Sequence, residues 1–282
     1  MTRVGRWKIR KFVLPLKSFC YLCVIKTHTM AKKGKYIYEY PHPAVTADCV
    51  VFGYDGKELK VLLVKRGAEK EASKSAFVGE WALPGGFLYM DPDISGKEDK
   101  KDKSDKTIAH TAARELKEET GLKLSVKDFK EVGSFSYYKR DPRERVITIA
   151  HYALVKLAEV QADTDADKAE WFSWNDIPHL AFDHDKILRV AFSKLKRDIH
   201  FEPVGFDLLP EVFTLPQLQN LYESILEVKF DRRNFANKMK HYEILQEVED
   251  DTPRNGTRTP IKYRFDKENY DRLKAKGSQL EF

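Results

Sequence analysis

The stretch RELKEETGL, residues 114–122, crowds three glutamates into a short segment that reaches a glycine near its end. On a helix, Glu115, Glu118 and Glu119 would present their carboxylates within one arc of the surface. Like charges at this spacing repel one another, and the last turn of a helix prefers cations. Arg114 can pair with Glu118, and a hard divalent cation such as Mg²⁺ would satisfy the other carboxylates. The stretch therefore predicts either a metal-binding helix or a solvated amphipathic one.

Around this stretch the sequence predicts a mixed sheet combined with helices. Apolar residues recur at every fourth position from Ile108 to Leu116, which buries one stripe of a helix that ends at Gly121. Upstream, two β-branched runs are joined by Asp55-Gly56, a pair suited to a tight hairpin turn. These runs lie at 44–54 and 60–67, further strands are expected at 134–138, 145–157 and 170–174, and a second helix at 183–199. Such an order of elements is typical of a mixed α/β sandwich.

The composition sets wide bounds on the class of protein. At 282 residues the chain is longer than the usual domain of about 100–200 residues, which favours two domains. Lys and Arg number 50 against 44 for Asp and Glu, so the net charge neither requires nor excludes a polyanionic partner. Three cysteines, Cys20, Cys23 and Cys49, do not suggest a disulfide framework. They favour a reducing compartment, and we expect a cytoplasmic protein.

Residues 1–35 are predicted to be an N-terminal extension. They are basic at the start, and Lys17 splits their apolar residues into two runs too short to span a membrane. A signal peptide is the competing interpretation, but no small-x-small cleavage site follows. We expect Met30 to be the working start of the chain, and no membrane association.

A second domain is predicted after a break at 201–211, where two prolines and a glycine interrupt the pattern. We place a first domain at 36–202 and a second at 203–282. The second contains helical patterns at 214–226 and 231–242, then strands at 244–250 and 261–265 around a polar loop. Two helices followed by a two-stranded ribbon are the plan of a winged helix.

The second of these helices is predicted to contact double-stranded DNA. Its inner face buries Phe235 and Met239, which leaves basic and amide side chains on the outer faces. Such side chains reach phosphates and base edges in the major groove. The predicted contacts are Arg232, Arg233, Asn237 and Lys238 on the helix, and Arg254 and Arg258 at the loop tip. The alternative is an interaction or dimerisation module with an ordinary charged surface.

With EWALPGGF at 80–87 upstream, RELKEETGL resembles the Nudix box, G-x5-E-x7-R-E-U-x-E-E-x-G-U, in which U is aliphatic. The resemblance implies a Nudix-type α/β/α sandwich with a mixed sheet. It also implies hydrolysis of a nucleoside diphosphate linked to another group, with Mg²⁺ or Mn²⁺. Glu115 and Glu119 would be the principal metal ligands and Gly85 a backbone ligand. Glu118 would be a further ligand or the partner of Arg114, and both belong to the expected catalytic set.

Two parts of the Nudix pattern are left open by the sequence. Lys106 stands where the box has its first glutamate, and the acids that could stand in are Asp91, Asp93 and Asp105. The general base is expected outside the box, and its candidates are Asp163, Asp165, Asp167, Glu170, Asp183 and His184. Asp183 could instead cap the second helix. Guanidinium groups that match phosphate oxygens are offered by Arg140, Arg143 and Arg145.

The two halves together resemble the Nudix-related transcriptional regulators, in which a Nudix domain similar to ADP-ribose pyrophosphatases precedes a winged helix. This resemblance covers roughly residues 40–265 and includes AFDH at 181–184 and DRRNFANKMK at 231–240. It implies hydrolysis of ADP-ribose or a related nucleotide sugar, because the box carboxylates are retained. The alternative is a ligand-responsive DNA-binding regulator that uses the Nudix domain as an effector sensor. We expect a homodimer.

Overall fold

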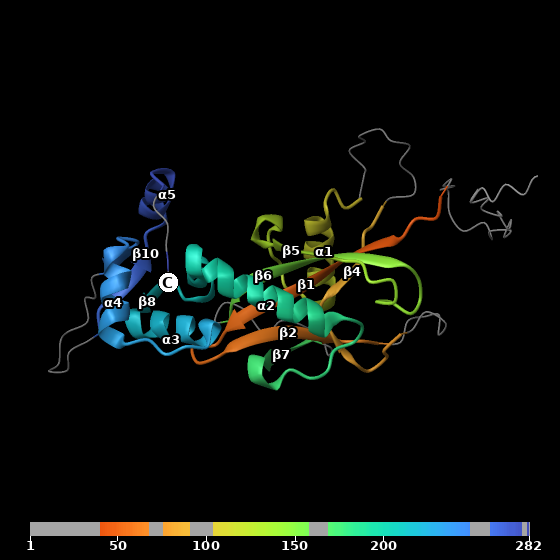
Figure 1. Cartoon of the computed structure of the whole chain (residues 1–282), viewed down its shortest axis with the longest axis horizontal. Coiled ribbons are helices and arrows are strands. Elements are labelled where there is room, and N and C mark those ends of the chain that lie inside the picture. The colour runs from red at the N-terminus through yellow and green to blue at the C-terminus, as the bar shows by residue number, and fades with distance from the viewer. Residues whose placement is uncertain are drawn as a thin grey trace, which may run out of the picture. The chain divides into compact units, whose positions relative to one another are not determined.

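A computed structural model describes residues 40–67, 76–90, 104–157, 169–248, 260–277 and 281. These residues belong to one compact unit, Tyr38–Phe282. In this part of the chain the strands form one sheet of seven and one of three (Figure 1). Some predictions concern residues outside it, namely those on the N-terminal extension with Met30, on Asp91 and Asp93, on Asp163, Asp165 and Asp167, and on Arg254 and Arg258.

The larger sheet is built around β1 (Ala44–Tyr54), which pairs in parallel with β6 (Val146–Lys156) along its whole length. β1 also pairs antiparallel with β2 (Leu59–Lys65) and with β4 (Gly85–Phe87). The remaining strands are β5 (Lys130–Phe135) beside β6, and β3 (Trp81–Ala82) and β7 (Ala169–Ser173) beside β2. One parallel pair among antiparallel ones makes the sheet mixed, as predicted.

The predicted hairpin between β1 and β2 is confirmed at Asp55. Its carboxylate accepts hydrogen bonds from the backbone N–H groups of Lys57 and Glu58 at 2.8 and 2.9 Å. Gly56 has a φ of 93°, a left-handed conformation that glycine adopts without strain. The turn residues therefore set the register of β1 on β2.

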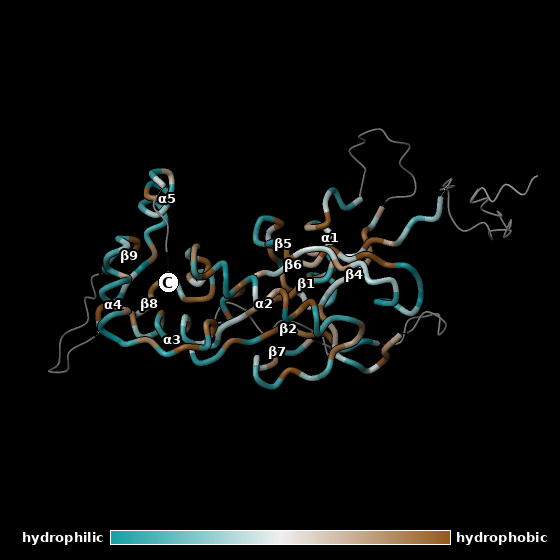
Figure 2. The backbone as a smooth tube through the Cα atoms, in the orientation of Figure 1, coloured by the Kyte–Doolittle hydropathy of each residue, from teal (hydrophilic) through white to brown (hydrophobic). Residues whose placement is uncertain are grey.

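Helices cover both faces of the larger sheet, because β1 is apolar on both sides. Phe52 belongs to the core that includes α2 (His184–Phe201), whereas Cys49 and Val51 belong to the core that includes α1 (Ile108–Thr120). In Figure 1, α2 lies in front of the sheet and α1 behind it. Figure 2 shows the apolar character of β2 as a brown stretch of the tube. The predicted α/β/α sandwich is confirmed.

The C-terminal part is a winged helix, as predicted. Its helix-turn-helix pair is α3 (Leu215–Leu226) and α4 (Arg232–His241). Its sheet has the order β8-β10-β9, with β8 at Val212–Thr214, β9 at Leu245–Val248 and β10 at Lys262–Phe265, followed by α5 at Lys267–Ala275. α4 begins after Asp231, whose carboxylate accepts the N–H of Asn234 at 2.8 Å. Strand β8 was not anticipated from the sequence, because three residues give too short a pattern.

One apolar core runs from the larger sheet into the winged helix. A 3-10 turn at Val204–Leu208 follows α2, and a Cβ on Gly205 would lie only 3.1 Å from Ile199 Cδ1. Lys196 on α2 also forms an ion pair with Glu227 at the end of α3. The chain position predicted as a domain boundary therefore lies within continuous packing. No helix in the described ranges is long and apolar enough to span a membrane.

Candidate functional site

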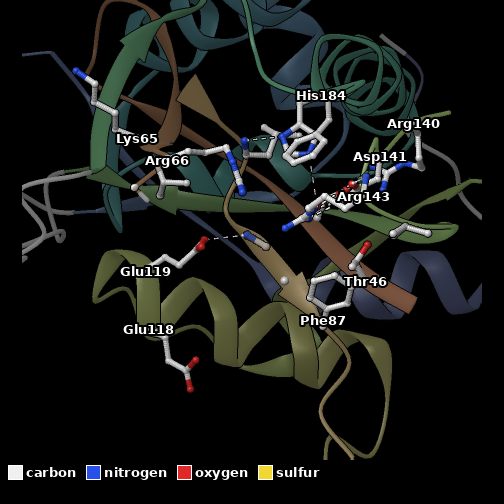
Figure 3. A pocket seen from close by; sticks show the side chains of 18 residues that line it. Thr46, Lys65, Arg66, Phe87, Glu118, Glu119, Arg140, Asp141, Arg143 and His184 are labelled. Carbon is white, nitrogen blue, oxygen red and sulfur yellow. Dashed lines mark hydrogen bonds and ion pairs between the residues drawn. The ribbon is translucent and has the colours of Figure 1, made fainter. Parts of the chain in front are cut away.

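A cavity of about 620 Å³ lies between α1, strands β1, β2 and β4, and the start of α2 (Figure 3). Acidic and basic side chains share its wall. The charged and titratable residues of the lining are Asp48, Lys65, Arg66, Glu118, Glu119, Arg140, Asp141, Arg143 and His184. A wall of mixed charge can bind phosphate oxygens through its bases and a divalent cation through its acids.

Helix α1 carries the box glutamates and ends at Gly121, as predicted; this glycine has a φ of 75°. Arg114 donates to Glu118 Oε2 at 3.2 Å, so the predicted pair is present, and to Glu115 Oε1 at 2.7 Å. The side chain of Glu118 is 59% exposed. In Figure 3 it points away from β4, whereas Glu119 points towards it. The three carboxylates therefore share a helix face without meeting at one point.

Strand β4 brings two glycines against these carboxylates. The N–H of Gly85 donates to Glu119 Oε2 at 2.9 Å. A Cβ on Gly86 would lie 2.4 Å from the carboxyl carbon of Glu115, and one on Gly85 would lie 2.3 Å from the carbonyl oxygen of Ala47. Only glycine permits β4 to approach both the backbone of β1 at Ala47 and the Glu115 side chain of α1 so closely. The role of Gly85 as a backbone metal ligand stays a prediction.

Burial removes the carboxylates around β4 from water. Desolvation raises the pKa of Glu119 from 4.5 to about 7, and burial also raises the pKa of Glu115. A divalent cation would reverse both shifts, and oxygen donors are the ligands that Mg²⁺ prefers. Within the described ranges, no three acidic, His or Cys side chains already surround a metal position. The donor chemistry fits the cation, and the ligand set Glu115, Glu118 and Glu119 stays a prediction.

The acid beside Arg114 is Asp105. Asp105 Oδ2 accepts a hydrogen bond from Arg114 Nη2 at 2.8 Å, whereas Lys106 is exposed. Among the three acids that the sequence left open, Asp105 is the one that the described residues include. Asp105 contacts the box through Arg114.

A buried ion-pair network forms another part of the wall. Arg140 has a side chain that is 4% exposed and donates to Asp48 Oδ2 at 3.0 Å and Asp183 Oδ1 at 2.8 Å. Asp183 stands at the start of α2, but its carboxylate makes no capping hydrogen bond. Its oxygens are engaged by Arg140 instead. These contacts give Arg140 a role in holding β1 and α2 together.

His184 is a neutral residue of the cavity wall. Its Nδ1 accepts the N–H of Leu83 at 2.9 Å, so the ring proton lies on Nε2, which faces Asp48 Oδ1 at 3.7 Å. Burial lowers the pKa of His184 and keeps the ring neutral. The other two described base candidates do not line the cavity. Glu170 is exposed on β7, and Asp183 forms an ion pair with Arg140. The identity of the base stays a prediction.

Two arginines of the wall rest on aromatic rings. Arg143 donates to Asp141 Oδ2 at 2.8 Å and lies 5.5 Å from the ring centre of Phe182. Arg66 lies 4.8 Å from the same ring. Phe182 itself has a φ of 56°, a strained conformation for a residue with a Cβ. Phe182 therefore supports two guanidinium groups that face the cavity.

The sequence reasoning missed Asp48, Lys65 and Arg66. All three follow or interrupt apolar runs that were interpreted only as strands. A charged residue inside a buried strand, such as Asp48, was the available signal, since a buried charge needs a partner. Arg145, a predicted phosphate contact, is exposed and is not among the cavity residues, whereas Arg143 is.

The predicted DNA-contacting residues of α4 lie on its outer surface. Phe235 and Met239 are buried in the core of the winged helix. The four predicted contacts on the helix, Arg232, Arg233, Asn237 and Lys238, are exposed. The helix therefore has the surface that groove binding requires, and contact with DNA stays a prediction.

Comparison with known proteins matches both halves of the chain. Residues 42–191 match the NUDIX domain, and residues 205–265 match the NrtR DNA-binding winged helix domain. The ADPR responsive transcriptional repressor NtrR of Acinetobacter baylyi is 30% identical over 236 residues, which cover 83% of this chain and 86% of that protein. The ADP-ribose pyrophosphatase of Methanocaldococcus jannaschii is 36% identical over 166 residues, or 59% of this chain and 80% of that protein.

A solved structure shares the whole arrangement. The crystal structure of Shewanella oneidensis NrtR complexed with a 27mer DNA is 27% identical, covers 78% of this chain and 93% of that chain, and has a TM-score of 0.60. The similarity therefore extends over the Nudix part and the winged helix together.

Proposed function

This chain belongs to the NUDIX domain family and carries an NrtR-type winged helix domain, and we propose that it is a DNA-binding regulator whose Nudix cavity senses an ADP-ribose-like nucleotide. The observation that carries the proposal is α4, a helix-turn-helix element with exposed Arg232, Arg233 and Lys238. The similarity to an ADPR responsive repressor supports it, because it spans both halves. A ligand cavity and a DNA-binding helix joined by one core are the two sites that a regulator couples.

The cavity offers complementary groups to a nucleotide that contains a diphosphate. The guanidinium groups of Arg66 and Arg143 match phosphate oxygens, and Phe182 holds both near the cavity. Glu119, which lines the cavity, and Glu115, whose carboxylate lies against Gly86, would hold a divalent cation, which neutralises a diphosphate and lowers the pKa of a bound water. Arg114 holds the carboxylate of Glu115, and the Gly85 N–H holds that of Glu119.

In the proposed complex, α4 enters the major groove of double-stranded DNA. Arg232 and Arg233 lie in its first turn, the end that a recognition helix directs at base edges. Lys238 would neutralise a phosphate further along the helix. Binding should therefore weaken as salt is added, in proportion to the number of phosphates contacted.

The regulator proposal is tested by selecting duplexes from a random library with the full chain and measuring their affinity with and without ADP-ribose. We expect a preferred sequence, a steep salt dependence and a change of affinity on adding the nucleotide. Weak and equal binding to every duplex, with no effect of ADP-ribose, would remove the proposal.

A second candidate function is hydrolysis of ADP-ribose, or of a related nucleotide sugar, at the diphosphate. It is favoured by the retention of Glu115, Glu118 and Glu119 on α1, together with the Arg114 pair. Water would be added across one P–O–P bridge, which gives AMP and ribose 5-phosphate from ADP-ribose. Incubation with ADP-ribose and Mg²⁺ or Mn²⁺, followed by chromatography, detects these products. Binding of ADP-ribose without turnover would leave the sensor role alone for this ligand.

We also propose that the working protein is a cytoplasmic homodimer, since a two-fold arrangement would match a palindromic DNA site. Light scattering on the full chain, at the concentrations used for DNA binding, measures the mass. A monomer that binds its selected duplex with full affinity would contradict the dimer.

A further inference from the structure

We propose that Asp105 supplies the carboxylate that the Nudix box lacks at Lys106, and that it positions Arg114 and, through Arg114, the carboxylate of Glu115. This inference rests on the proposed function of the Nudix cavity as a metal and nucleotide site. It assigns Asp105 a positioning role, because Asp105 accepts hydrogen bonds from Arg114 and from the backbone of Tyr89 and is not among the residues that line the cavity.

Both carboxylate oxygens of Asp105 are engaged by Arg114. Oδ2 lies 2.8 Å from Arg114 Nη2, and Oδ1 lies 3.2 Å from Nε, so the guanidinium is held along one edge by a fork of two hydrogen bonds. The Asp105 side chain is only 6% exposed. Although burial acts to raise the pKa of Asp105, the hydrogen bonds from Arg114 and the Tyr89 N–H outweigh it and lower that pKa. The carboxylate is therefore ionised and enclosed.

The other edge of the same guanidinium faces the functional site. Arg114 Nη1 donates to Glu115 Oε1 at 2.7 Å, and Nη2 donates to the carbonyl oxygen of Phe87 at 3.0 Å. Phe87 follows Gly86, the residue whose missing Cβ leaves room for the Glu115 carboxylate. Holding one edge of a planar group fixes the other, so Asp105 orients the contact between α1 and β4.

The position of Asp105 explains how the acid can move by one residue. Helix α1 begins at Ile108, after the cap residue Thr107, so Asp105 lies in the segment that leads into the helix. Side chains on a helix lean towards its N-terminus, which lets the long Arg114 side chain reach back to that segment. Lys106 carries the same charge as Arg114 and could not take this role.

Asp105 is also tied to Tyr89, which lies two residues after strand β4. Its N–H donates to the Tyr89 carbonyl oxygen at 2.9 Å, and its Oδ2 accepts the Tyr89 N–H at 3.0 Å. These two hydrogen bonds join the flanks of the segment between residues 90 and 104.

The test uses the full chain and the variants Asp105→Ala, Asp105→Asn and Lys106→Ala. Mn²⁺ alone is titrated and followed by electron paramagnetic resonance, which needs no turnover. We expect Asp105→Ala and Asp105→Asn to weaken Mn²⁺ binding roughly 10–100-fold, the range for residues that orient metal ligands, and Lys106→Ala to leave it unchanged. The double variant Asp105→Ala/Lys106→Glu should recover part of the lost affinity, because it restores an acid at the position used by the box.

A second measurement follows Arg114 itself in the metal-free protein. The Nε–H signal of Arg114 in ¹⁵N spectra, assigned with Arg114→Lys, should be protected from exchange and should lose that protection in Asp105→Asn. The isosteric Asp105→Asn chain keeps this test usable if Asp105→Ala does not fold. Folding of each variant is checked by thermal unfolding.

Mn²⁺ binding by the native chain and by the Asp105 variants separates the positioning role of Asp105 from the proposed function. A native chain that binds Mn²⁺, with folded Asp105 variants that bind it equally and keep the Arg114 signal protected, overturns the positioning role and leaves the proposed function standing. A native chain that binds neither Mn²⁺ nor ADP-ribose overturns the proposed function and the inference with it.

Discussion

Arg140 in the wall of the Nudix cavity is 4% exposed and holds two carboxylates, whereas Arg232 and Arg233 on α4 are exposed to solvent. Removing a buried guanidinium leaves buried acids without their partner, which strongly destabilises a fold. An exposed guanidinium contributes little to stability, but it can neutralise a phosphate of a polyanion. Among these three arginines, burial thus separates the one that holds the protein together from the two that we propose contact DNA.

The largest effect is expected at Arg140. Arg140→Met should lower the free energy of unfolding by roughly 3–5 kcal/mol, because Asp48 and Asp183 lose their shared partner in a buried site. Urea denaturation at pH 7 measures the change. The matched control is Arg145→Met, an exposed arginine five residues away, which should change stability by less than about 0.5 kcal/mol. Equal losses of unfolding free energy in Arg140→Met and Arg145→Met would show that burial of the arginine does not decide its contribution to stability.

The next effect concerns the buried carboxylate of Glu119 and depends on pH. Its pKa is about 7 in the folded chain and 4.5 ordinarily, so the folded chain binds the proton more tightly and loses stability as pH rises from about 4.5 to about 7. The full shift corresponds to about 3 kcal/mol. We expect about 1–2 kcal/mol, since the side chain is partly open to the cavity and solvent screens its charge.

Glu119→Gln tests this expectation in metal-free protein. Glutamine does not ionise, so the variant should be more stable than the native chain at pH 8 and equally stable at pH 4.5. Thermal unfolding with a chelator present, at both pH values, gives the comparison. A variant that is less stable at pH 8 would show that Glu119 is satisfied by the protein alone, as the charges of the Arg140 network are.

An effect of similar size separates the two glycines of β4. Gly85→Ala should cost about 1–3 kcal/mol of stability, because its Cβ would meet the backbone oxygen of Ala47, which cannot move away. Gly86→Ala should cost less, since its Cβ meets the Glu115 side chain, but it should weaken Mn²⁺ binding by displacing that carboxylate. Urea denaturation and Mn²⁺ titration of both variants separate the effect on packing from the effect on metal binding. Reversal of the two stability losses would contradict the close approach described here.

The smallest effect on the fold is expected on α4. Arg232→Ala and Arg233→Ala should each change stability by less than about 0.5 kcal/mol. Each should also lower the magnitude of the salt slope of DNA binding by about 1, because one phosphate contact is lost. Fluorescence anisotropy on a selected duplex at several salt concentrations measures the slope, with the exposed Lys123→Ala in the Nudix part as the control. A loss of stability comparable to that of Arg140→Met would show that Arg232 and Arg233 stabilise the fold as Arg140 does.

The sequence predicted the elements that depend on neighbouring residues. The helix end at Gly121, the Arg114–Glu118 pair and the hairpin at Asp55 are local, and all three are present. The winged helix was also predictable, because its two helices and the strands β9 and β10 follow one another in the sequence.

The rest of the site depends on pairing between distant strands. Asp48 reaches Arg140, 92 positions away in sequence, because β1 supplies a buried wall of the cavity, and no local pattern encodes that contact. The register that sets Asp48 opposite Gly85 arises in the same way. Asp105 was left among three alternatives because its selection depends on the backbone of Tyr89, which the sequence does not place.

The apolar core that passes from Phe52 through Ile199 to Tyr222 couples the stability of the two halves. A chain that stops after Glu202 would lose Gly205 and Tyr222, which pack beside Ile199, and exposed apolar patches promote aggregation. The Nudix part and the winged helix are therefore expected to unfold in one transition.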